Sequence, residues 1–373
     1  MHAGPGVAAA GLLGALAGPN GESRSLLQVA QAHGLLPQLG RLNPDWLRSV
    51  PPDELDRLTQ QHAHRCLRLT RELIRLLDVL DRHGVQAIPF KGPVLAVQLY
   101  GDPAARCYQD IDFLVRDTEA DRALSVLVAN GYEPEPEVRR HQLRRWRGWL
   151  DHCRLTREGT IVELHWGLDQ RGLFSLDLHT ARTALDSVRL GGRTVRTLSR
   201  EHLVLYLAAH GAKHAWQRLE WILDFGELVR TSPNLDWRGM ADAARARGAE
   251  RALRLALRLA RDLAGVAPPE NFAAPVAEDM RVSALARDVG RSLRGSRPLR
   301  PGSWTLETFH LRVQERLRDR VRYLARLLFA SGPADWALLP LPVALSWLHA
   351  LVRPLRLGVE VTTPFRNRAG GPA

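Results

Sequence analysis

The chain has 373 residues, of which 45% are hydrophobic and 25% charged, so it has the composition of an ordinary globular protein with room for two or three domains. Its net charge of +12 comes mainly from arginines spread along predicted helices, for example Arg245, Arg251 and Arg258, which favours solvated helix faces over a nucleic-acid surface. The three cysteines show neither paired nor metal-ligand spacing, which argues against a disulfide scaffold and indicates reduced thiols.

The N-terminal region is predicted to be helical and carries no recognisable chemistry. Met1–Gly18 lacks the basic residues of a signal peptide, so we expect a cytoplasmic protein, with a short helix over 8–17. A second helix is predicted over Leu26–Leu39. After two prolines, Asp53 begins a long amphipathic helix that should end at Gly84.

The next segment predicts a phosphate-binding turn. Val85–Phe90 is apolar and predicts a strand, and Val94–Leu99 predicts a short helix. Between them, Gly92 lets the backbone approach a ligand closely, and the helix N-terminus offers free N–H groups to an anion. Lys91 adds a compact positive charge in a chain whose basic residues are otherwise almost all arginine.

Two aspartates follow on a predicted strand. Asp110 and Asp112 are two residues apart, so their side chains leave the same face, and the apolar Phe113–Val115 that follows places the strand in the interior. Adjacent carboxylates repel each other unless a cation lies between them, and oxygen ligands suit Mg²⁺ or Mn²⁺. A metal beside a phosphate-binding turn is the arrangement that phosphoryl or nucleotidyl transfer requires. A solvated strand edge is the alternative.

A hairpin supplies the third candidate carboxylate. After a predicted helix over Thr118–Asn130, the segments Cys153–Thr156 and Thr160–His165 read as two strands around a Glu-Gly turn. Glu163 and His165 share a face there. Glu163 either binds a metal or pairs with an arginine, and His165 either contacts substrate, carries a proton or is structural. The stretch 141–149 interleaves arginine with tryptophan, which either stacks on bases or packs a helix.

From Ser199 onward the pattern is helical. His210 and His214 are one helical turn apart, but glycine at position 211 replaces the glutamate of a zinc-protease motif, so substrate positioning is preferred to zinc. Core packing around Trp216 and Trp221 is the alternative. The residues expected to line the substrate site are His210, Lys213, His214, Trp216, Arg218 and Asp224.

The C-terminal third predicts further helices. Trp237–Ala264 should form two helices broken at Gly248, and Leu306–Phe329 one long basic helix, with linkers at 268–275 and 295–301. The apolar stretch Trp336–Val352 is interrupted by prolines and is too short to span a membrane. We expect it to dock onto the helical domain; a peripheral membrane contact, with Arg353 and Arg356 near headgroups, is the less favoured alternative.

These motifs together resemble a known superfamily. Lys91-Gly92, Tyr100, Arg106 and the strand from Asp110 to Val115 look like the nucleotidyltransferase-fold proteins of the DNA polymerase β superfamily, and within it the poorly characterised bacterial nucleotidyltransferase family proteins. The resemblance implies an α+β fold, with a small mixed β-sheet core embedded in a predominantly helical chain. The chain departs from the superfamily at Gly92-Pro93, where glycine is usually followed by serine, so one hydroxyl contact to a triphosphate is missing.

The resemblance also implies roles for individual residues. Asp110, Asp112 and Glu163 would be catalytic and would bind Mg²⁺ or Mn²⁺. Lys91, Gly92 and Arg106 would bind the nucleotide, while the weaker substrate-lining set comprises His165, His210, Lys213, His214, Arg218 and Asp224.

The expected organisation and activity follow from these roles. Residues 1–83 would form a helical cap, 84–198 the catalytic core, 199–265 a helical domain covering the nucleotide, 266–361 a C-terminal helical region and 362–373 a disordered tail. The expected reaction transfers a nucleoside monophosphate from an NTP, with ATP as the expected donor, to an unidentified small molecule, peptide or saccharide, and releases pyrophosphate. The alternatives are a non-catalytic binding protein of the same fold and an accessory protein of a peptide or polysaccharide pathway.

Overall fold

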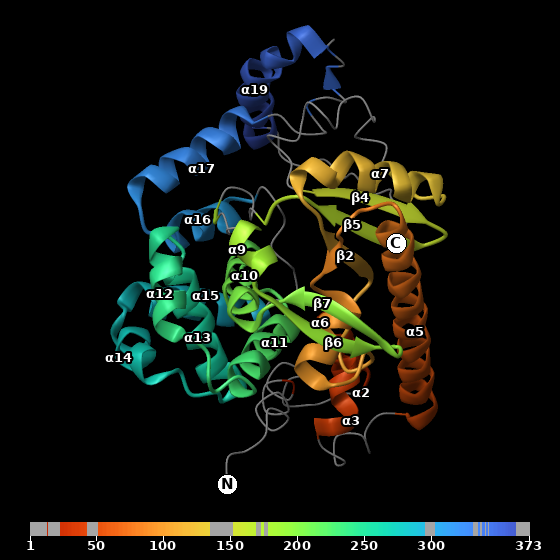
Figure 1. The fold of residues 1–373 in the computed structure, drawn as a ribbon. Coiled ribbons are helices and arrows are strands. Elements are labelled where there is room, and N and C mark those ends of the chain that lie inside the picture. The colour runs from red at the N-terminus through yellow and green to blue at the C-terminus, as the bar shows by residue number, and fades with distance from the viewer. Residues whose placement is uncertain are drawn as a thin grey trace.

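The computed structural model describes residues 13, 23–42, 51–134, 152–168, 173–174, 178–294, 303–330, 335, 338–339, 341 and 343–362. Except for Leu13, the helix predicted over 8–17 lies outside the described residues, as do the stretch 141–149, the linker at 295–301 and the tail beyond 362. Helices surround one mixed β-sheet in an α+β arrangement, as expected (Figure 1).

The central sheet has five strands in the order β1-β2-β5-β4-β3, and only the β2–β5 pair is parallel. The predicted strand over Val85–Phe90 shrinks to two residues, because Pro89 has no N–H to extend a ladder. The predicted hairpin is confirmed and turns at Glu158 and Gly159, both with positive φ. The bounds are β1 Ile88–Pro89, β2 Asp110–Leu114, β3 Glu133–Pro134, β4 His152–Arg157 and β5 Thr160–His165.

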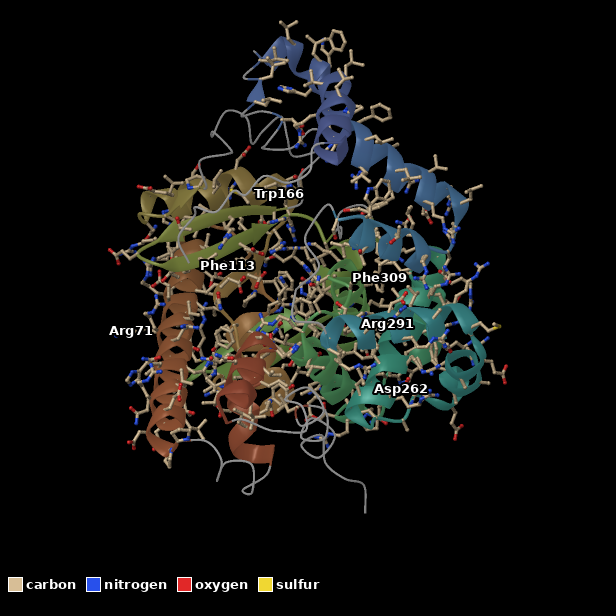
Figure 2. The ribbon with its side chains drawn as sticks, turned by 180° about the vertical axis from the view of Figure 1, so that it is seen from behind. Arg71, Phe113, Trp166, Asp262, Arg291 and Phe309 are labelled. Carbon is tan, nitrogen blue, oxygen red and sulfur yellow. The ribbon has the colours of Figure 1, made fainter. Side chains whose placement is uncertain are left out.

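Helices cover one face of this sheet. The long predicted helix is confirmed as α5 (Pro52–Arg82), and α7 (Ala120–Ala129), preceded by the 3₁₀ turn η1 (Asp117–Glu119), lies beside it. Ile111 and Phe113 point into the apolar layer under these helices, whereas Arg71 faces solvent from α5 (Figure 2). Because side chains alternate along a strand, Asp110 and Asp112 leave the opposite face.

A second hairpin, which was not predicted from the sequence, lies against β1. Strands β6 (Leu185–Leu190) and β7 (Arg193–Leu198) pair around Gly191 and Gly192, and α9 (Leu178–Thr183) precedes them. Strand β7 contacts β1, and β6 contacts α6 (Gly92–Tyr100), the helix that follows the glycine turn. The hairpin therefore supports the glycine turn from the side of the sheet edge.

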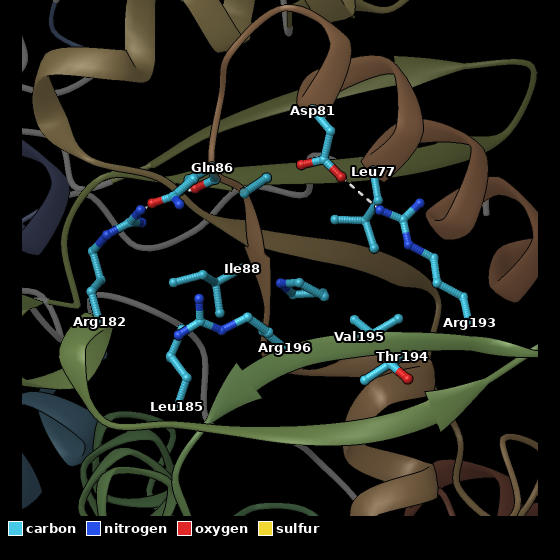
Figure 3. A pocket seen from close by; sticks show the side chains of 12 residues that line it. Leu77, Asp81, Gln86, Ile88, Arg182, Leu185, Arg193, Thr194, Val195 and Arg196 are labelled. Atoms are coloured by element: carbon cyan, nitrogen blue, oxygen red, sulfur yellow. Dashed lines mark hydrogen bonds and ion pairs between the residues drawn. The ribbon is translucent and has the colours of Figure 1, made fainter.

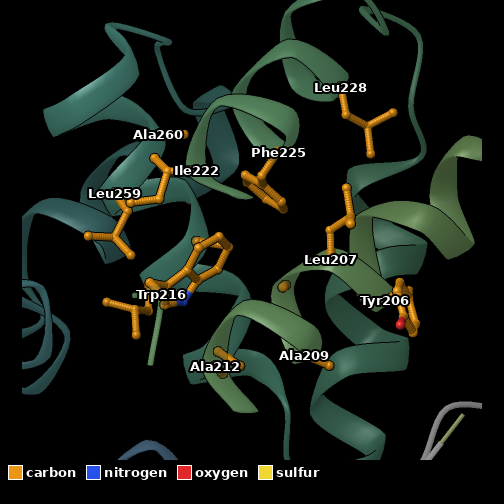
Figure 4. Packing of buried hydrophobic residues seen from close by; sticks show 14 of the residues in the cluster. Tyr206, Leu207, Ala209, Ala212, Trp216, Ile222, Phe225, Leu228, Leu259 and Ala260 are labelled. Atoms are coloured by element: carbon orange, nitrogen blue, oxygen red, sulfur yellow. The ribbon is translucent and has the colours of Figure 1, made fainter. Parts of the chain in front are cut away.

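The helical part packs around α13 and contains a fully buried tryptophan. Trp216 fits against Phe225 with ring centroids 6.1 Å apart, and the neighbouring leucines and alanines close the core (Figure 4). The break at Gly248 is confirmed. The helices are α10 Arg200–Lys213, α11 Leu219–Arg230, α12 Trp237–Ala246, α13 Glu250–Ala264, α14 Glu270–Glu278, α15 Met280–Arg294 and α16 Trp304–Val313.

Three helix predictions were wrong in detail. The linker predicted at 268–275 is largely helix α14, which accommodates Pro275 inside it. The helix predicted over Leu306–Phe329 is two helices, because the carbonyl oxygen of Gln314 accepts hydrogen bonds from Arg251 and Arg320 in place of a helical N–H. The helix predicted over Leu26–Leu39 is also divided, at Gly34 with φ +72°, into α2 (Ser23–Ala32) and α3 (Leu36–Leu42).

At the C-terminal end, α17 (Leu317–Phe329) packs against α19 (His349–Thr362), which follows the 3₁₀ segment η2 (Val343–Leu348) (Figure 1). Arg353 and Arg356 both bind the buried carboxylate of Asp335, at 2.7 Å each, so these guanidinium groups hold the end of the chain together. Within the described ranges, none of the helices combines the length and the apolarity needed to cross a lipid bilayer.

Candidate active site

The predicted carboxylates meet on the face of the sheet opposite α5 and α7. Strands β2 and β5 pair in parallel with Asp112 directly beside Glu163 and Asp110 beside Ile161. Paired residues of parallel strands project from the same face, so Asp110, Asp112 and Glu163 line one surface. The long-range strand pairing thus brings together the three carboxylates that were predicted from the sequence.

Asp112 is the most buried of the three, with 1% of its surface exposed. Its Oδ1 accepts hydrogen bonds from Lys91 Nζ at 2.7 Å and from His165 Nε2 at 3.1 Å. Nε2 of His165 also lies 3.4 Å from Oε2 of Glu163. Oδ2 of Asp112 is buried and has no hydrogen-bond partner among the described residues, which is costly for a carboxylate in a protein interior.

The electrostatics of the site separate the two aspartates. Burial, with the charge of Asp112 beside it, raises the pKa of Asp110 to about 6. Burial acts in the same direction on Asp112, but Lys91 and the hydrogen bond from His165 outweigh it and lower its pKa. Burial opposes the charged form of Lys91, yet the negative charge of Asp112 holds the pKa of Lys91 well above its usual value. Asp112 is therefore an ionised carboxylate matched by an ammonium group.

Aromatic rings fix the orientation of His165 and Lys91. The imidazole of His165 stacks on His152 with centroids 5.1 Å apart and meets the edge of Phe90 at 5.3 Å. Lys91 Nζ lies 5.4 Å and 5.6 Å from the ring centroids of Phe90 and Tyr206, within cation–π range. Neither His152 nor Tyr206 was predicted from the sequence. His152 pairs with His165 across the β4–β5 hairpin, so the hairpin register could have indicated it.

The glycine turn brings the start of α6 against the aspartate strand. Gly92 has φ +55°, and a Cβ atom added there would lie 3.1 Å from the carbonyl oxygen of Asp110. Only glycine adopts this conformation without strain at such a close approach. Pro93 occupies the first turn of α6 and has no N–H, so it offers neither an amide nor a hydroxyl to an anion.

Arg106 is buried in a network of acidic residues. Its Nε donates to Asp224 Oδ2 at 2.6 Å and its Nη2 to Glu220 Oε1 at 3.4 Å, while Tyr100 OH donates to Asp224 Oδ1 at 2.9 Å. Arg218 binds the other side of Glu220 at 3.0 Å. The network ties the loop before β2 to helix α11. Its acidic members were not recognised as Arg106 partners in the sequence, since they lie more than 110 residues away.

A cleft of about 660 Å³ opens over this surface. Asp110 and Glu163 line one part of it, and the helices α2, α3, α5, α10 and α11 contribute to its other walls. Asp224 is buried behind Arg106 and does not line it, and Trp216 belongs to the core. The predicted residues that the structure brings to the cleft are Lys91, Arg106, Asp110, Glu163, His165, His210, Lys213, His214 and Arg218.

His210, in the last turn of α10, and His214, directly after that helix, pack with aromatic rings. His210 stacks on Tyr206 with centroids 5.6 Å apart and contacts His214 at 4.7 Å, and Trp221 lies against both histidines. Burial and the neighbouring His214 hold the pKa of His210 well below its usual value, so its ring is neutral. Within the described part of the chain these two histidines belong to no close group of three or more potential metal ligands.

A second cavity, of about 230 Å³, lies between β7 and the end of α5 (Figure 3). Arg182 and Arg193 flank it, and Arg193 binds Asp81 at 2.6 Å. None of the predicted site residues lines this cavity, so the candidate active site remains the carboxylate-lined cleft.

Comparison with known proteins identifies the family. No curated protein matches the chain. Among solved structures, the antibiotic-resistance factor ANT(2'')-Ia aligns over 59% of this chain and 90% of its own, at 13% identity and a TM-score of 0.28. A nucleotidyltransferase-like protein from Paracoccidioides brasiliensis aligns over 50% and 92%, at 21% identity and a TM-score of 0.31. A family model described as "uncharacterised nucleotidyltransferase" matches residues 19–265, about two thirds of the chain; the protein belongs to that family.

Proposed function

We propose that the protein is a divalent-metal-dependent nucleotidyltransferase that moves a nucleoside monophosphate from an NTP, with ATP as the expected donor, to an acceptor nucleophile. The observation that carries this proposal is the direct pairing of Asp112 with Glu163, with Asp110 on the same face, at a cleft beside the glycine turn. Membership of the nucleotidyltransferase family supports the same chemistry.

The donor set fits a divalent cation. Asp112 Oδ2 is buried without a partner, and the ligand atoms of Asp112, Glu163 and His165 lie within 4.8 Å of one another. Asp110 stands at the rim of the same group and lines the cleft. A Mg²⁺ or Mn²⁺ ion held here would neutralise charge on the phosphates and on the attacking oxygen. Asp110, Asp112 and Glu163 are the proposed ligands.

The chain's own groups would then bind and orient the nucleotide. Gly92 allows the phosphates to approach the start of α6, and Lys91, 2.7 Å from Asp112, would turn from the carboxylate to a phosphate oxygen. Arg106 uses Nε and Nη2 to hold the acidic residues of α11, and its Nη1 makes no hydrogen bond with the described residues, so this group would face the nucleotide. Tyr206, His210, His214 and Trp221 offer an aromatic wall to the rest of the substrate.

In the reaction the acceptor's nucleophilic atom forms a bond to the α-phosphorus. The bond from that phosphorus to the oxygen bridging the α- and β-phosphates breaks, and pyrophosphate leaves with the bonding electron pair. Glu163, exposed to the cleft, would accept the proton of the acceptor. Positioning of the two substrates and electrostatic stabilisation of the transition state would supply most of the rate acceleration, as in other phosphoryl transfers.

The experiment that tests the proposal measures pyrophosphate release from each of the four NTPs with Mg²⁺ or Mn²⁺, in the presence of candidate acceptors. Asp112→Asn should abolish release and retain the fold, which circular dichroism would check. Nucleotide binding should be measured in parallel by calorimetry. Binding without release that survives Asp112→Asn would support the non-catalytic binding protein, and release unaffected by Asp112→Asn would contradict the assignment.

A further inference from the structure

The cation site contains a nitrogen atom that an all-carboxylate site lacks. Among the described residues, the one group of three or more acidic, histidine or cysteine side chains close enough to share an ion consists of Asp112, Glu163 and His165. His165 Nε2 lies 3.1 Å from Asp112 Oδ1 and 3.4 Å from Glu163 Oε2. For metal–ligand bonds of 2.0–2.1 Å, adjacent ligands of an octahedron are about 3.0 Å apart. The distances from Nε2 to the two carboxylate oxygens are therefore close to the spacing of neighbouring ligands around one ion.

The imidazole is held with Nε2 toward the carboxylates. His165 ends β5, where its carbonyl oxygen accepts a hydrogen bond from the backbone N–H of Val115 at 2.8 Å. The imidazole stacks on His152 and makes a T-shaped contact with Phe90, and only 7% of His165 is exposed, so neighbouring rings restrict its movement. A ring confined in this way presents the same nitrogen to the site with little loss of entropy on binding an ion.

We propose that His165 Nε2 is a metal ligand together with Asp112 and Glu163, and that this nitrogen makes the site favour Mn²⁺ over Mg²⁺. The inference rests on the proposed function for the metal's role in transfer. Mg²⁺ is a hard ion that selects oxygen ligands, whereas imidazole binds first-row transition metals well. Asp110 would then contribute from the rim.

The opposing arrangement is an all-oxygen site in which His165 only donates hydrogen bonds to the two carboxylates. The two arrangements differ in whether the imidazole nitrogen is bonded to the metal. Mn²⁺ is paramagnetic, so a directly bound nitrogen gives a ¹⁴N hyperfine coupling in pulsed electron paramagnetic resonance. This readout does not depend on turnover.

The experiment uses the full-length protein with Mn²⁺ alone and with Mn²⁺ plus a non-hydrolysable ATP analogue. We expect ¹⁴N coupling in the wild type, its loss in His165→Gln, and its retention in His152→Phe, which keeps an aromatic ring against His165. Titration should show Mn²⁺ affinity reduced by about 10-fold or more in His165→Gln, with a smaller effect on Mg²⁺ measured by competition.

Three results would overturn the proposal: bound Mn²⁺ without nitrogen coupling, coupling that persists in His165→Gln, or no Mn²⁺ binding at millimolar concentration. If His165→Gln does not fold, the wild-type spectrum beside that of His152→Phe still decides the question. Pyrophosphate release from a protein without nitrogen coupling would leave the proposed function standing and remove only this inference. Nitrogen coupling in a protein that releases no pyrophosphate would support this inference and contradict the proposed transfer activity.

Discussion

The buried network around Arg106 makes a quantitative prediction about stability. In Asp224→Asn the shape of the side chain is kept and its charge is removed. The guanidinium of Arg106, 8% exposed, would lose the partner at 2.6 Å and keep Glu220 at 3.4 Å. Tyr100 would keep an oxygen acceptor at the position of Oδ1, 2.9 Å away in the wild type, but that acceptor would be a neutral amide. Removing one member of a buried ion pair costs about 3–5 kcal/mol, because the other charge stays buried without compensation.

Urea unfolding followed by tryptophan fluorescence would measure this cost, since Trp216 and Trp221 lie on the helical side of the network. The matched control is Asp242→Asn, which breaks the 2.9 Å pair with Arg245 on the exposed surface of α12. That change should cost at most about 1 kcal/mol. If Asp224→Asn loses no more stability than Asp242→Asn, then Arg106 is not held by Asp224 as described, and its assignment as the residue tying the two regions together is wrong.

Three further changes test the local geometry. Gly92→Ala should cost more stability than Gly101→Ala, because both changes carry about 1–2 kcal/mol of backbone strain but only the Cβ at position 92 also meets a carbonyl oxygen, at 3.1 Å. Gly101 has φ +74° and no atom near an added Cβ. Gly92→Ala should also weaken NTP binding measured by calorimetry. Gly211→Ala should destabilise by about 1–3 kcal/mol because the buried tryptophan occupies the space, whereas Gly290→Ala, on an open face of a helix, should stabilise by about 0.5–1 kcal/mol; equal thermal shifts would contradict this. Lys91→Met should let Mn²⁺ bind the nucleotide-free protein at least about 10-fold more tightly, as measured by electron paramagnetic resonance, because an ammonium group no longer competes for the carboxylate; unchanged or weaker binding would refute the competition.

Local patterns in the sequence were sufficient to predict the elements that carry the site. Alternation placed Asp110 and Asp112 on one strand face, and the apolar periodicity predicted α5 almost to its ends. The β4–β5 hairpin was also predicted, with Glu163 and His165 on one face. These features depend on residues within a few positions of one another, which is why sequence patterns predict them.

Pairings between distant segments could not be read in the same way. The register that sets Asp112 beside Glu163 and the bond of Lys91 to Asp112 arise from tertiary packing. The interruption at Gln314 likewise depends on Arg251, 63 residues earlier. The β6–β7 hairpin did carry a local signal, since Gly191-Gly192 lies between alternating segments, and it could have been predicted.

The parallel pairing of β2 with β5 also bears on how the site forms during synthesis. Asp112 leaves the ribosome about fifty residues before Glu163, an interval of roughly 3–10 s at 5–20 residues per second. The interval between Arg106 and its partner Asp224 is longer, because Asp224 lies 118 residues further along the chain. Contacts of such long range slow folding, so the Arg106 network would be completed after the cation site, once the helix containing Asp224 has docked. A nascent chain stopped before that helix should already pair Asp112 with Glu163 and should lack the acidic partners of Arg106.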